Sequence, residues 1–528
     1  MMHCLITIAI IMASFAIFLT NGEFYSSVHQ MSKVMDFELK MLKNMQKFIG
    51  KNQNKLDYLK ERLAEYERER NEAVQMGSSY FENPVNKYLL TKRLTSDWDR
   101  LENILQYKEG EKTLKKIENK IVNESELEGA LEGVLRLQDV YRFNTSDIAS
   151  GLFQGVQYDV HFDARHCFDL GKRAAETEYV KLGYFWLKEA LKRSADDASV
   201  DKLDIELAIA HVKFKLGDIK GANETYAELS SRYPENEKVA KLFSEFVVNS
   251  ADKPQYYVDY SVEHEPPPEH IFSASREKLY KYTCAGLIKK TPADERDLRC
   301  GYLVETHPFL WLAPIKVEEL HHDPLLVVFY DVLSDKEIET LRDMTKRIER
   351  ATVMSPNGSV VSKVRTSQFQ FIPVTHHPLL GKIDQRVADM TNLDMKYAED
   401  HQFANYGIGG HYSEHHDYFY IESVKKTTIS DYDTLGNRIA TLLFYLSDVE
   451  QGGGTAYPYM KTLVMPKKGA AAFWYNLHAS GDRDWRSLHG ACPIIVGSKW
   501  VQNRWIREHD QSEKRPCYTF NDKVEEIL

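Results

Sequence analysis

The chain has 528 residues, of which 43% are hydrophobic, with 68 Lys and Arg against 78 Asp and Glu and six Cys. At about 150 residues per domain this length predicts three or four domains, and the ordinary hydrophobic fraction excludes whole-chain disorder and a collagen-like repeat. The formal net charge of −10 argues against a general nucleic-acid binder, which needs a basic surface.

The first predicted element is an apolar run over residues 5–19, which is followed by Thr20, Asn21 and Gly22. The run is too short and too near the N-terminus for a transmembrane helix, so we predict a cleaved signal peptide over residues 1–22. A signal anchor is the alternative, because no Lys or Arg precedes the run. A signal peptide would direct the protein into the secretory pathway.

An oxidising compartment would allow disulfide bonds to form. From proximity in the sequence alone, we expect Cys284 to pair with Cys300 and Cys492 with Cys517, which leaves Cys167 free. Four N-x-S/T sequons are candidate glycosylation sites: Asn123, Asn144, Asn223 and Asn357.

Residues 23–145 are predicted to be helical. Leu42, Ile49, Leu56 and Leu63 recur every seventh residue, and a companion series of apolar positions accompanies them: Met45, Leu59 and Tyr66. This pattern indicates a coiled coil that joins two chains in a dimerisation region. An amphipathic helix packed within its own domain is the alternative.

Residues 150–249 have the pattern of paired helices. The Leu-Gly-Asp break at 216–218, followed by a helix and by Tyr-Pro-Glu at 233–235, is typical of a tetratricopeptide-like domain that binds an extended peptide. A plain helical bundle is the alternative. The segment 250–275 is rich in Pro and Glu and lacks periodicity, so we interpret it as an interdomain linker.

Beyond the linker, short apolar runs alternate with turns, which predicts an all-β domain over residues 276–528 with its core at 325–510. A double-stranded β-helix, or jelly roll, fits this spacing. The fold class predicted for the whole chain is therefore multidomain α + β.

A non-haem iron site needs two imidazoles and one carboxylate, and a His-x-Asp pair supplies two of these from one face of a strand. The sequence contains three such pairs, which begin at His161, His321 and His415. We interpret the first two as incidental, because one lies in the helical half and the other is followed by Pro324. The third precedes His489, at the start of an apolar strand, and Lys499, an isolated cation between strands.

Residues 325–517 resemble the catalytic domain of animal collagen prolyl 4-hydroxylase α-subunits. The resemblance rests on the segments NYGIGGHYSEHHDYF, GNRIATLLFYLSDVEQGGGTAYP and PKKGAAAFWYNLHASGDRDWRSLHGACPIIVGSKWVQNRWIRE, and on KRPC at 514–517. It extends over the mature chain through PVNKYLLTKRLTSDW at 84–98 and VLRLQDVY at 134–141.

The resemblance implies an Fe(II)- and 2-oxoglutarate-dependent dioxygenase of the endoplasmic reticulum lumen. Iron would be held by His415, Asp417 and His489, and 2-oxoglutarate would meet Lys499 and Tyr406. Three further side chains match positions that line the proline site in related hydroxylases: Tyr412, Arg438 and Trp505.

The same resemblance implies that O₂ and 2-oxoglutarate are consumed, that succinate and CO₂ are released, and that peptidyl proline of a procollagen-like chain becomes 4-hydroxyproline. Ascorbate would keep the iron active. It also implies a heterotetramer of two catalytic and two protein disulfide isomerase subunits, in which the isomerase carries the retention signal.

The sequence departs from the family in the peptide-binding domain, where tyrosines are expected. Ala208, His211, Glu245 and Val248 occupy these positions, and Arg507 stands where the family commonly has His near the co-substrate. We therefore hypothesise an active prolyl 4-hydroxylase with an altered peptide preference. The alternatives are hydroxylation of another residue such as lysine, a non-catalytic procollagen-binding chaperone, and a structural zinc site.

Overall fold

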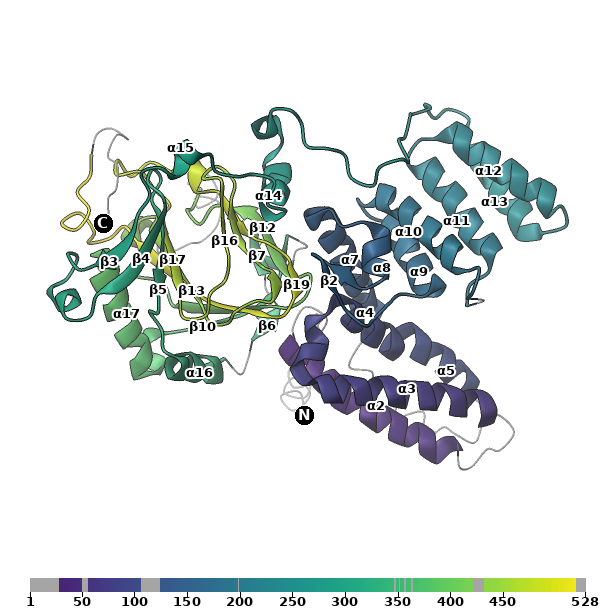
Figure 1. The fold of residues 1–528 in the computed structure, drawn as a ribbon, viewed down its shortest axis with the longest axis horizontal. Helices are drawn as coiled ribbons and strands as arrows, with labels where there is room; N and C mark the ends of the chain where they lie inside the picture. The colour runs from purple at the N-terminus through teal and green to yellow at the C-terminus, as the bar shows by residue number, and fades with distance from the viewer. Residues whose placement is uncertain are drawn as a thin grey trace, which may run out of the picture.

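The computed structural model describes residues 28–49, 56–105, 124–197, 199–345, 348–350, 352–355, 358–361, 364–420 and 432–518. The chain forms a helical half, made by the N-terminal part, and a sheet-containing half, made by the C-terminal part, which lie side by side (Figure 1). The predicted signal peptide and the sequons at Asn123 and Asn357 lie outside the described residues. Within the described part of the chain, no helix is long and apolar enough to span a bilayer.

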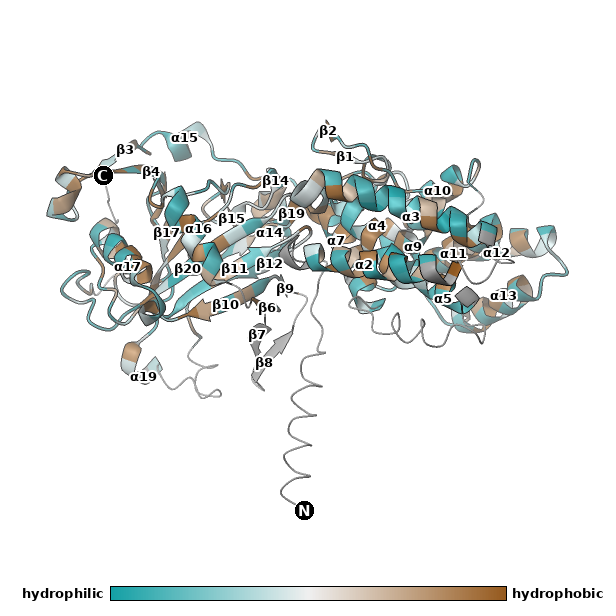
Figure 2. Ribbon diagram, turned by 90° about the horizontal axis from the view of Figure 1, so that it is seen from below, coloured by the Kyte–Doolittle hydropathy of each residue, from teal (hydrophilic) through white to brown (hydrophobic). Residues whose placement is uncertain are grey.

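The first helical unit is built around the residues of the predicted heptads. Leu42, Met45, Ile49, Leu59 and Tyr66 are buried in one apolar cluster. They therefore pack within their own chain, and dimerisation through them stays a prediction. Hydrophilic and hydrophobic residues alternate along these helices (Figure 2). The elements of the unit are α2 (Val28–Ile49), α3 (Leu56–Met76), η3 (Gly77–Glu82), α4 (Pro84–Lys92), η4 (Arg93–Asp97) and α5 (Trp98–Leu105).

Helix α7 (Glu124–Tyr141) lies between this unit, the paired helices that follow it and the sheets (Figure 1). It packs against α4, α9 and α14. The elements that follow it are α8 (Thr145–Ala149), the short strands β1 (Leu152–Phe153) and β2 (Val156–Gln157), and the helices α9 (Ala164–Ala175), α10 (Val180–Arg193), α11 (Lys202–Lys215), α12 (Ile219–Arg232) and α13 (Glu237–Ser250).

Local chemistry explains where these helices begin and end. Asp163 caps α9 by accepting a hydrogen bond from the His166 amide at 2.8 Å, so the first His-x-Asp pair has a structural use. Gly217 has φ +79°, a conformation that glycine adopts without steric cost, and it ends α11 before Asp218 caps α12. The Leu-Gly-Asp break is thus a turn between two helices.

The predicted linker is irregular, and it lies against the helical half. The Tyr256 amide donates to the Gly217 carbonyl at 2.8 Å, and the Tyr260 ring lies 4.2 Å from that of Tyr184. Further along, the Glu263 carboxylate accepts a hydrogen bond from the Thr145 amide at 2.8 Å. The segment is therefore held along α7, α8 and α10 by specific contacts.

The C-terminal half contains two large antiparallel sheets. The nine-stranded sheet has the order β3 (Cys300–Leu303), β4 (Ile315–His321), β5 (Leu326–Tyr330), β17 (Ala471–Tyr475), β13 (Arg438–Tyr445), β20 (Lys499–Arg507), β11 (His401–Tyr406), β10 (Gln368–Ile372) and β6 (Glu349–Arg350). The five-stranded sheet has the order β16 (Thr462–Val464), β15 (Thr455–Tyr457), β18 (His489–Ala491), β12 (His411–His415) and β9 (Arg365–Thr366). Two small hairpins add β7 (Thr352–Ser355) with β8 (Gly358–Val361), and β14 (Gln451–Gly452) with β19 (Ile494–Val496).

The central strands of the nine-stranded sheet are buried on both faces, and strand alternation divides their side chains between two cores. On β13, Leu442 and Phe444 join the cluster that includes residues of α16 (Asp335–Met344) and α17 (Pro378–Thr391). Leu443 and Tyr445 join the other cluster, which includes residues of the five-stranded sheet. Successive side chains of a strand point to opposite faces, so the apolar run is buried on both sides. The second cluster supports the face on which the polar site lies.

The disulfide pairing expected from proximity is wrong. Cys284 bonds to Cys492, with the Cα atoms 5.6 Å apart, whereas Cys300 and Cys517 are free and exposed and Cys167 is free and buried. The reason is tertiary: α14 (Arg276–Cys284) packs against β12, β15 and β16, which brings its last residue to the end of β18. Cys300 begins the edge strand β3 of the other sheet.

Candidate active site

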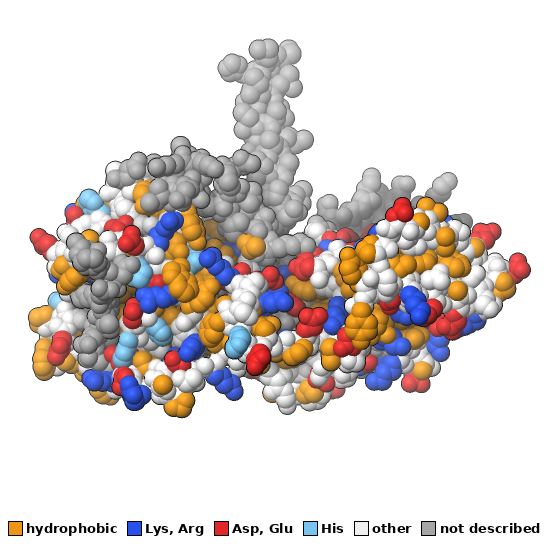
Figure 3. Space-filling view, turned by 90° about the horizontal axis from the view of Figure 1, so that it is seen from above, with side chains coloured by type: hydrophobic (Ala, Val, Ile, Leu, Met, Phe, Trp, Pro, Cys, Tyr) orange, Lys and Arg blue, Asp and Glu red, His pale blue; other side chains and the backbone are white. Residues whose placement is uncertain are grey.

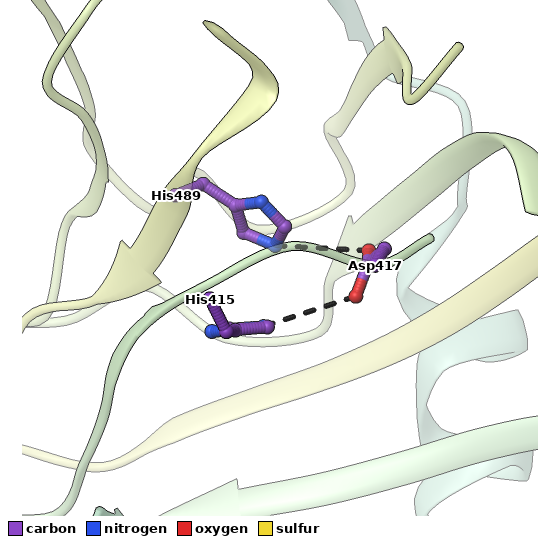
Figure 4. Close-up of side chains that lie close together, drawn as sticks. All are labelled: His415, Asp417 and His489. Carbon is purple, nitrogen blue, oxygen red and sulfur yellow. Dashed lines mark ion pairs between the residues drawn. The ribbon is translucent and has the colours of Figure 1, made fainter. Parts of the chain in front are cut away.

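Two neighbouring strands bring the predicted metal ligands together. Strands β12 and β18 pair so that His415 lies opposite His489, and Asp417 follows just beyond the end of β12. His415 Nε2 lies 3.8 Å from Asp417 Oδ1, and His489 Nε2 lies 3.6 Å from Asp417 Oδ2 (Figure 4). In the described part of the chain, this is the one cluster of three His, Cys, Asp or Glu side chains with metal-ligand spacing.

Backbone carbonyls fix the orientation of both imidazoles. His415 Nδ1 lies 2.8 Å from the Ser413 carbonyl, and His489 Nδ1 lies 3.0 Å from the Ser487 carbonyl. A ring that donates through Nδ1 keeps its lone pair on Nε2, which is the atom that faces Asp417 in each case. The two Nε2 atoms are therefore free to act as metal ligands.

The carboxylate is also held from behind. Asp417 Oδ2 accepts a hydrogen bond from the Thr441 hydroxyl at 2.7 Å, and Thr441 accepts one from the Asn476 amide at 2.9 Å. Burial opposes the charged form of Asp417, but the facing imidazoles of His489 and His415 hold the pKa of its carboxyl below the usual value. Burial together with His489 lowers the pKa of His415. A charged carboxylate beside a neutral imidazole is the ionisation state that binds a divalent metal ion.

At the other end of the site, a lysine is buried without a carboxylate partner. Lys499 is 1% exposed, and its Nζ donates to the Gly453 carbonyl at 2.7 Å and to the Thr455 hydroxyl at 3.3 Å. Among the described residues no carboxylate pairs with it, and burial lowers its pKa to about 7. A buried ammonium group with neutral acceptors alone is a strong site for an anion, which would repay the cost of burying the charge.

One pocket joins the metal-ligand cluster to the lysine. Tyr406 lies opposite Lys499 on the neighbouring strand β11, and the Tyr412 ring stacks on the His415 ring at 3.6 Å. The pocket is lined by Tyr406, Tyr412, His415, Asp417, Leu443, Thr455, Trp474, His489, Ala491, Lys499, Val501, Asn503 and Trp505. Seven of the eight side chains predicted to bind the metal, the co-substrate or the proline therefore line one pocket.

The eighth side chain, Arg438, does not line the pocket but contacts residues that do. Its guanidinium forms two hydrogen bonds of 2.6 Å with Glu399, lies 3.9 Å over the Trp505 ring and donates to the Asp417 carbonyl at 3.3 Å. Arg507 does not line the pocket either, because it binds the Gly436 carbonyl at 2.6 Å and Glu399 at 3.2 Å. Arg507 thus lies beside Glu399, at the end of β20 remote from Lys499.

Sequence reasoning missed several residues of the site. Asn503 lines the pocket and could have been found, because it shares the parity of Lys499, Val501 and Trp505 on β20. Thr441 and Glu399 had no such signal, since their partners are distant in the sequence.

The donor set fits the groups that an iron- and 2-oxoglutarate-dependent enzyme binds. Two oriented imidazoles and a charged carboxylate leave part of the coordination sphere open, as a non-haem Fe(II) centre requires. The unpaired ammonium group of Lys499 matches a carboxylate of an organic acid. The metal-ligand cluster and Lys499 line the same pocket, so one organic acid could contact both.

Comparison with known proteins agrees with this geometry. Residues 27–155 match the family model of the prolyl 4-hydroxylase alpha-subunit N-terminal region, and residues 401–507 match that of the 2OG-Fe(II) oxygenase superfamily. The prolyl 4-hydroxylase subunit alpha-1 of Homo sapiens is 32% identical over 523 residues, which cover 94% of this chain and 96% of the relative. The prolyl 4-hydroxylase subunit alpha-2 of Caenorhabditis elegans is 32% identical over 518 residues, or 94% of each chain.

Among solved structures, the viral collagen prolyl hydroxylase of Paramecium Bursaria Chlorella virus-1 is 27% identical, covers 34% of this chain and 95% of its own, and has a TM-score of 0.28. The match to the curated relatives spans almost the whole of both chains and includes an oxygenase domain. The chain therefore belongs to the prolyl 4-hydroxylase α-subunit family and is an Fe(II)- and 2-oxoglutarate-dependent dioxygenase.

Proposed function

We propose that this protein converts peptidyl proline to 4-hydroxyproline, with O₂ and 2-oxoglutarate as co-substrates and succinate and CO₂ as products. One observation supports this above all others. A single pocket connects a two-histidine, one-carboxylate cluster to a buried lysine that no carboxylate of the described residues neutralises.

The proposal assigns iron to His415, Asp417 and His489. When bound with 2-oxoglutarate and O₂, the iron supplies the oxidising power for C–H hydroxylation, and ascorbate restores iron that has been oxidised without product. The chain's own contribution is orientation. Hydrogen bonds from the two Nδ1 atoms and from Thr441 set the donor atoms before any metal binds, which lowers the cost of ordering them.

Lys499 is assigned to the distal carboxylate of 2-oxoglutarate, and Tyr406 to a further hydrogen bond with it. Two of the three Nζ protons are directed to Gly453 and Thr455, so the ammonium group is fixed in place with a donor to spare. A charge-assisted contact in a site closed to water is worth more than the same contact in solution.

Tyr412, Trp505 and Arg438 are assigned to the proline side of the pocket. Tyr412 and Trp505 offer aromatic walls, against which a proline ring can pack. Arg438 is stacked on Trp505 and paired with Glu399, which supports a role in positioning that wall. A peptide seated here would also exclude water from the reacting atoms.

We assign the helices from α9 to α13 to a tetratricopeptide-like peptide-binding domain, and the two antiparallel sheets to a jelly roll. The pairing of α9 with α10 and of α11 with α12 supports the first assignment. The residues that replace the expected tyrosines are accessible: His211, Glu245 and Val248 are exposed, and Ala208 is partly buried. Their character favours a peptide preference different from that of the collagen-binding relatives.

The compartment and the partner follow from the family. We place the protein in the lumen of the endoplasmic reticulum, in a heterotetramer with protein disulfide isomerase and with two catalytic chains joined through the 23–145 region. The exposed sequons Asn144 and Asn223 and the Cys284–Cys492 bond support this compartment. Positive and negative side chains are interspersed on the face seen in Figure 3, which agrees with a protein rather than a nucleic-acid partner.

The test is succinate release by the full-length chain co-expressed with a protein disulfide isomerase. Fe(II), ascorbate, 2-oxoglutarate and a panel of proline- and lysine-containing peptides are supplied, and the products are mapped by mass spectrometry. Peptide-stimulated succinate together with 4-hydroxyproline is the expected result. Hydroxylysine would change the substrate assignment, and an iron-loaded protein that binds procollagen without turnover would favour the chaperone function.

A further inference from the structure

Helix α7, which belongs to the N-terminal helical half, contacts the two glycine turns that border the co-substrate end of the pocket. One turn, residues 407–410, joins β11 to β12 and so connects Tyr406 to the strand that ends in His415. The other, residues 452–454, starts at the last residue of β14, leads into β15 and contains the carbonyl that accepts from Lys499. Both turns lie far from α7 in the sequence.

Tyr141, the last residue of α7, is hydrogen-bonded at the second turn. Its hydroxyl donates to the Pro493 carbonyl at 2.6 Å and accepts at 3.3 Å from the Gly453 amide, which also donates to the Pro493 carbonyl at 3.1 Å. The carbonyl of the same Gly453 accepts from Lys499 Nζ at 2.7 Å. A single residue therefore separates the Tyr141 hydroxyl from the lysine ammonium group.

The conformation of this turn requires glycine at two positions beside the Tyr141 hydroxyl. Gly452 and Gly453 both have positive φ, at +74° and +70°, which glycine alone adopts at little cost. A Cβ atom added to Gly452 would lie 2.8 Å from the Tyr141 hydroxyl. The Tyr141 hydroxyl, together with Ile495 and the Pro493 carbonyl, thus occupies the space that a larger residue would need.

Arg136, at the middle of α7, holds the first turn in a similar way. Its Nη1 donates to the Gly409 carbonyl at 2.7 Å in a buried setting. A Cβ atom on Gly409 would approach the Gly133 backbone of α7 to 3.0 Å, so helix and turn are in direct contact. Gly409 has φ +67°, which again restricts the position to glycine.

We propose that α7 is a structural part of the co-substrate site, in which Tyr141 positions Lys499 through Gly453 and Arg136 positions the turn that follows Tyr406. This inference rests on the proposed function, because it takes Lys499 as the partner of the 2-oxoglutarate carboxylate. It makes Tyr141 a positioning residue that does not touch the co-substrate. It also means that the oxygenase domain needs the N-terminal half to bind 2-oxoglutarate well.

The test compares Tyr141→Phe with Tyr158→Phe in the full-length enzyme. Tyr158 offers a matched control, because its hydroxyl also crosses to the oxygenase half and donates to Glu450 Oε1 at 2.8 Å. We expect Tyr141→Phe to raise the KM for 2-oxoglutarate about three- to ten-fold, the size expected for one hydrogen bond, with kcat and the peptide KM unchanged. Tyr158→Phe should leave all three constants unchanged.

Binding is measured separately from turnover by calorimetric titration of the manganese-loaded enzyme with 2-oxoglutarate in the absence of O₂. The Kd should rise for Tyr141→Phe by the same factor as KM. In a Lys499→Ala background the added Tyr141→Phe change should have no further effect on Kd, because the positioned group is gone. Equal losses from Tyr141→Phe and Tyr158→Phe, or additive losses in the double variant, would overturn the inference.

Two further results separate the possible failures. If Lys499→Ala binds 2-oxoglutarate as the wild type does, the role of Lys499 in the proposed function is wrong. If Lys499→Ala binds weakly and Tyr141→Phe binds normally, the inference about α7 alone is wrong. If Tyr141→Phe fails to fold, Arg136→Gln tests the contact of the same helix with the other turn. We expect this variant also to raise the Kd for 2-oxoglutarate.

Discussion

The oxygenase pocket and the helical domain from α9 to α13 hold their functional side chains in different ways. In the pocket three of the groups assigned to the metal and the co-substrate have fixed neighbours: His415 contacts a backbone carbonyl, Asp417 accepts from Thr441 and Lys499 donates to Gly453. In the helical domain, three of the four positions where tyrosines were expected are exposed on the helix surface, as the 77% exposure of Val248 illustrates.

This difference shows at which positions substitutions cost little stability. Replacing a buried, hydrogen-bonded group leaves its partner unsatisfied and costs several kcal/mol, whereas an exposed substitution changes stability by about 0.5 kcal/mol or less. The pocket is therefore constrained by packing, whereas the exposed positions of the helical domain can change at almost no cost to the fold. The predictions below run from the most constrained group to the least.

The largest effect is expected for Asp417→Ala. Loss of the single charged ligand should reduce iron affinity and lower turnover about 1,000-fold or more, because a metal ligand contributes several kcal/mol to the transition state. Succinate release and iron content of the purified protein measure both effects. His161→Ala, in the exposed His-x-Asp pair ahead of α9, is the control and should retain full activity. An Asp417→Ala variant that kept its iron and its turnover would contradict the ligand assignment.

The next largest effect is expected for Lys499→Ala. Removal of a charge-assisted contact should raise the KM for 2-oxoglutarate about 10- to 100-fold while iron binding stays intact. The control is Lys461→Ala, since Lys461 pairs with Asp294 at a solvent-exposed position. An unchanged KM would place the co-substrate carboxylate elsewhere in the pocket.

The binding of 2-oxoglutarate should depend on pH. Burial lowers the pKa of Lys499 to about 7 in the free enzyme, and the protonated form binds the carboxylate. Affinity should therefore be constant below about pH 7 and fall by up to about tenfold for each pH unit above it. Calorimetric titrations between about pH 6 and pH 9 measure this. A Kd that does not change with pH would show that the lysine stays charged without its ligand.

The smallest effect is expected in the helical domain. The double substitution Ala208→Tyr with His211→Tyr should strengthen the binding of a proline-rich peptide to the full-length protein about two- to ten-fold, because aromatic faces are the usual contact of an extended proline helix. Lys192→Tyr, at an exposed position of α10, is the control. Equal affinity of the wild type and the double variant would mean that these positions do not face the peptide.

Parts of the fold and site followed from short-range patterns. The i, i+2 spacing of His415 and Asp417 predicted two metal ligands on one face of a strand; the two side chains do meet, although β12 ends at His415 and Asp417 lies beyond it. The Leu-Gly-Asp break predicted a turn between two helices, where Gly217 adopts positive φ. That no carboxylate of the described residues pairs with Lys499 could not be seen in the sequence, since it depends on which strands lie beside β20.

The amino-acid sequence alone determined the chemistry: the donor types, their order along the chain and the lysine that follows them. The tertiary structure alone decided which distant groups meet, including the Cys284–Cys492 bond, the support of Asp417 by Thr441 and the contact of Tyr141 with Gly453. The physical reason is that periodicity and turn chemistry act over a few residues, whereas these contacts join segments whose relative placement is set by the packing of whole sheets and helices.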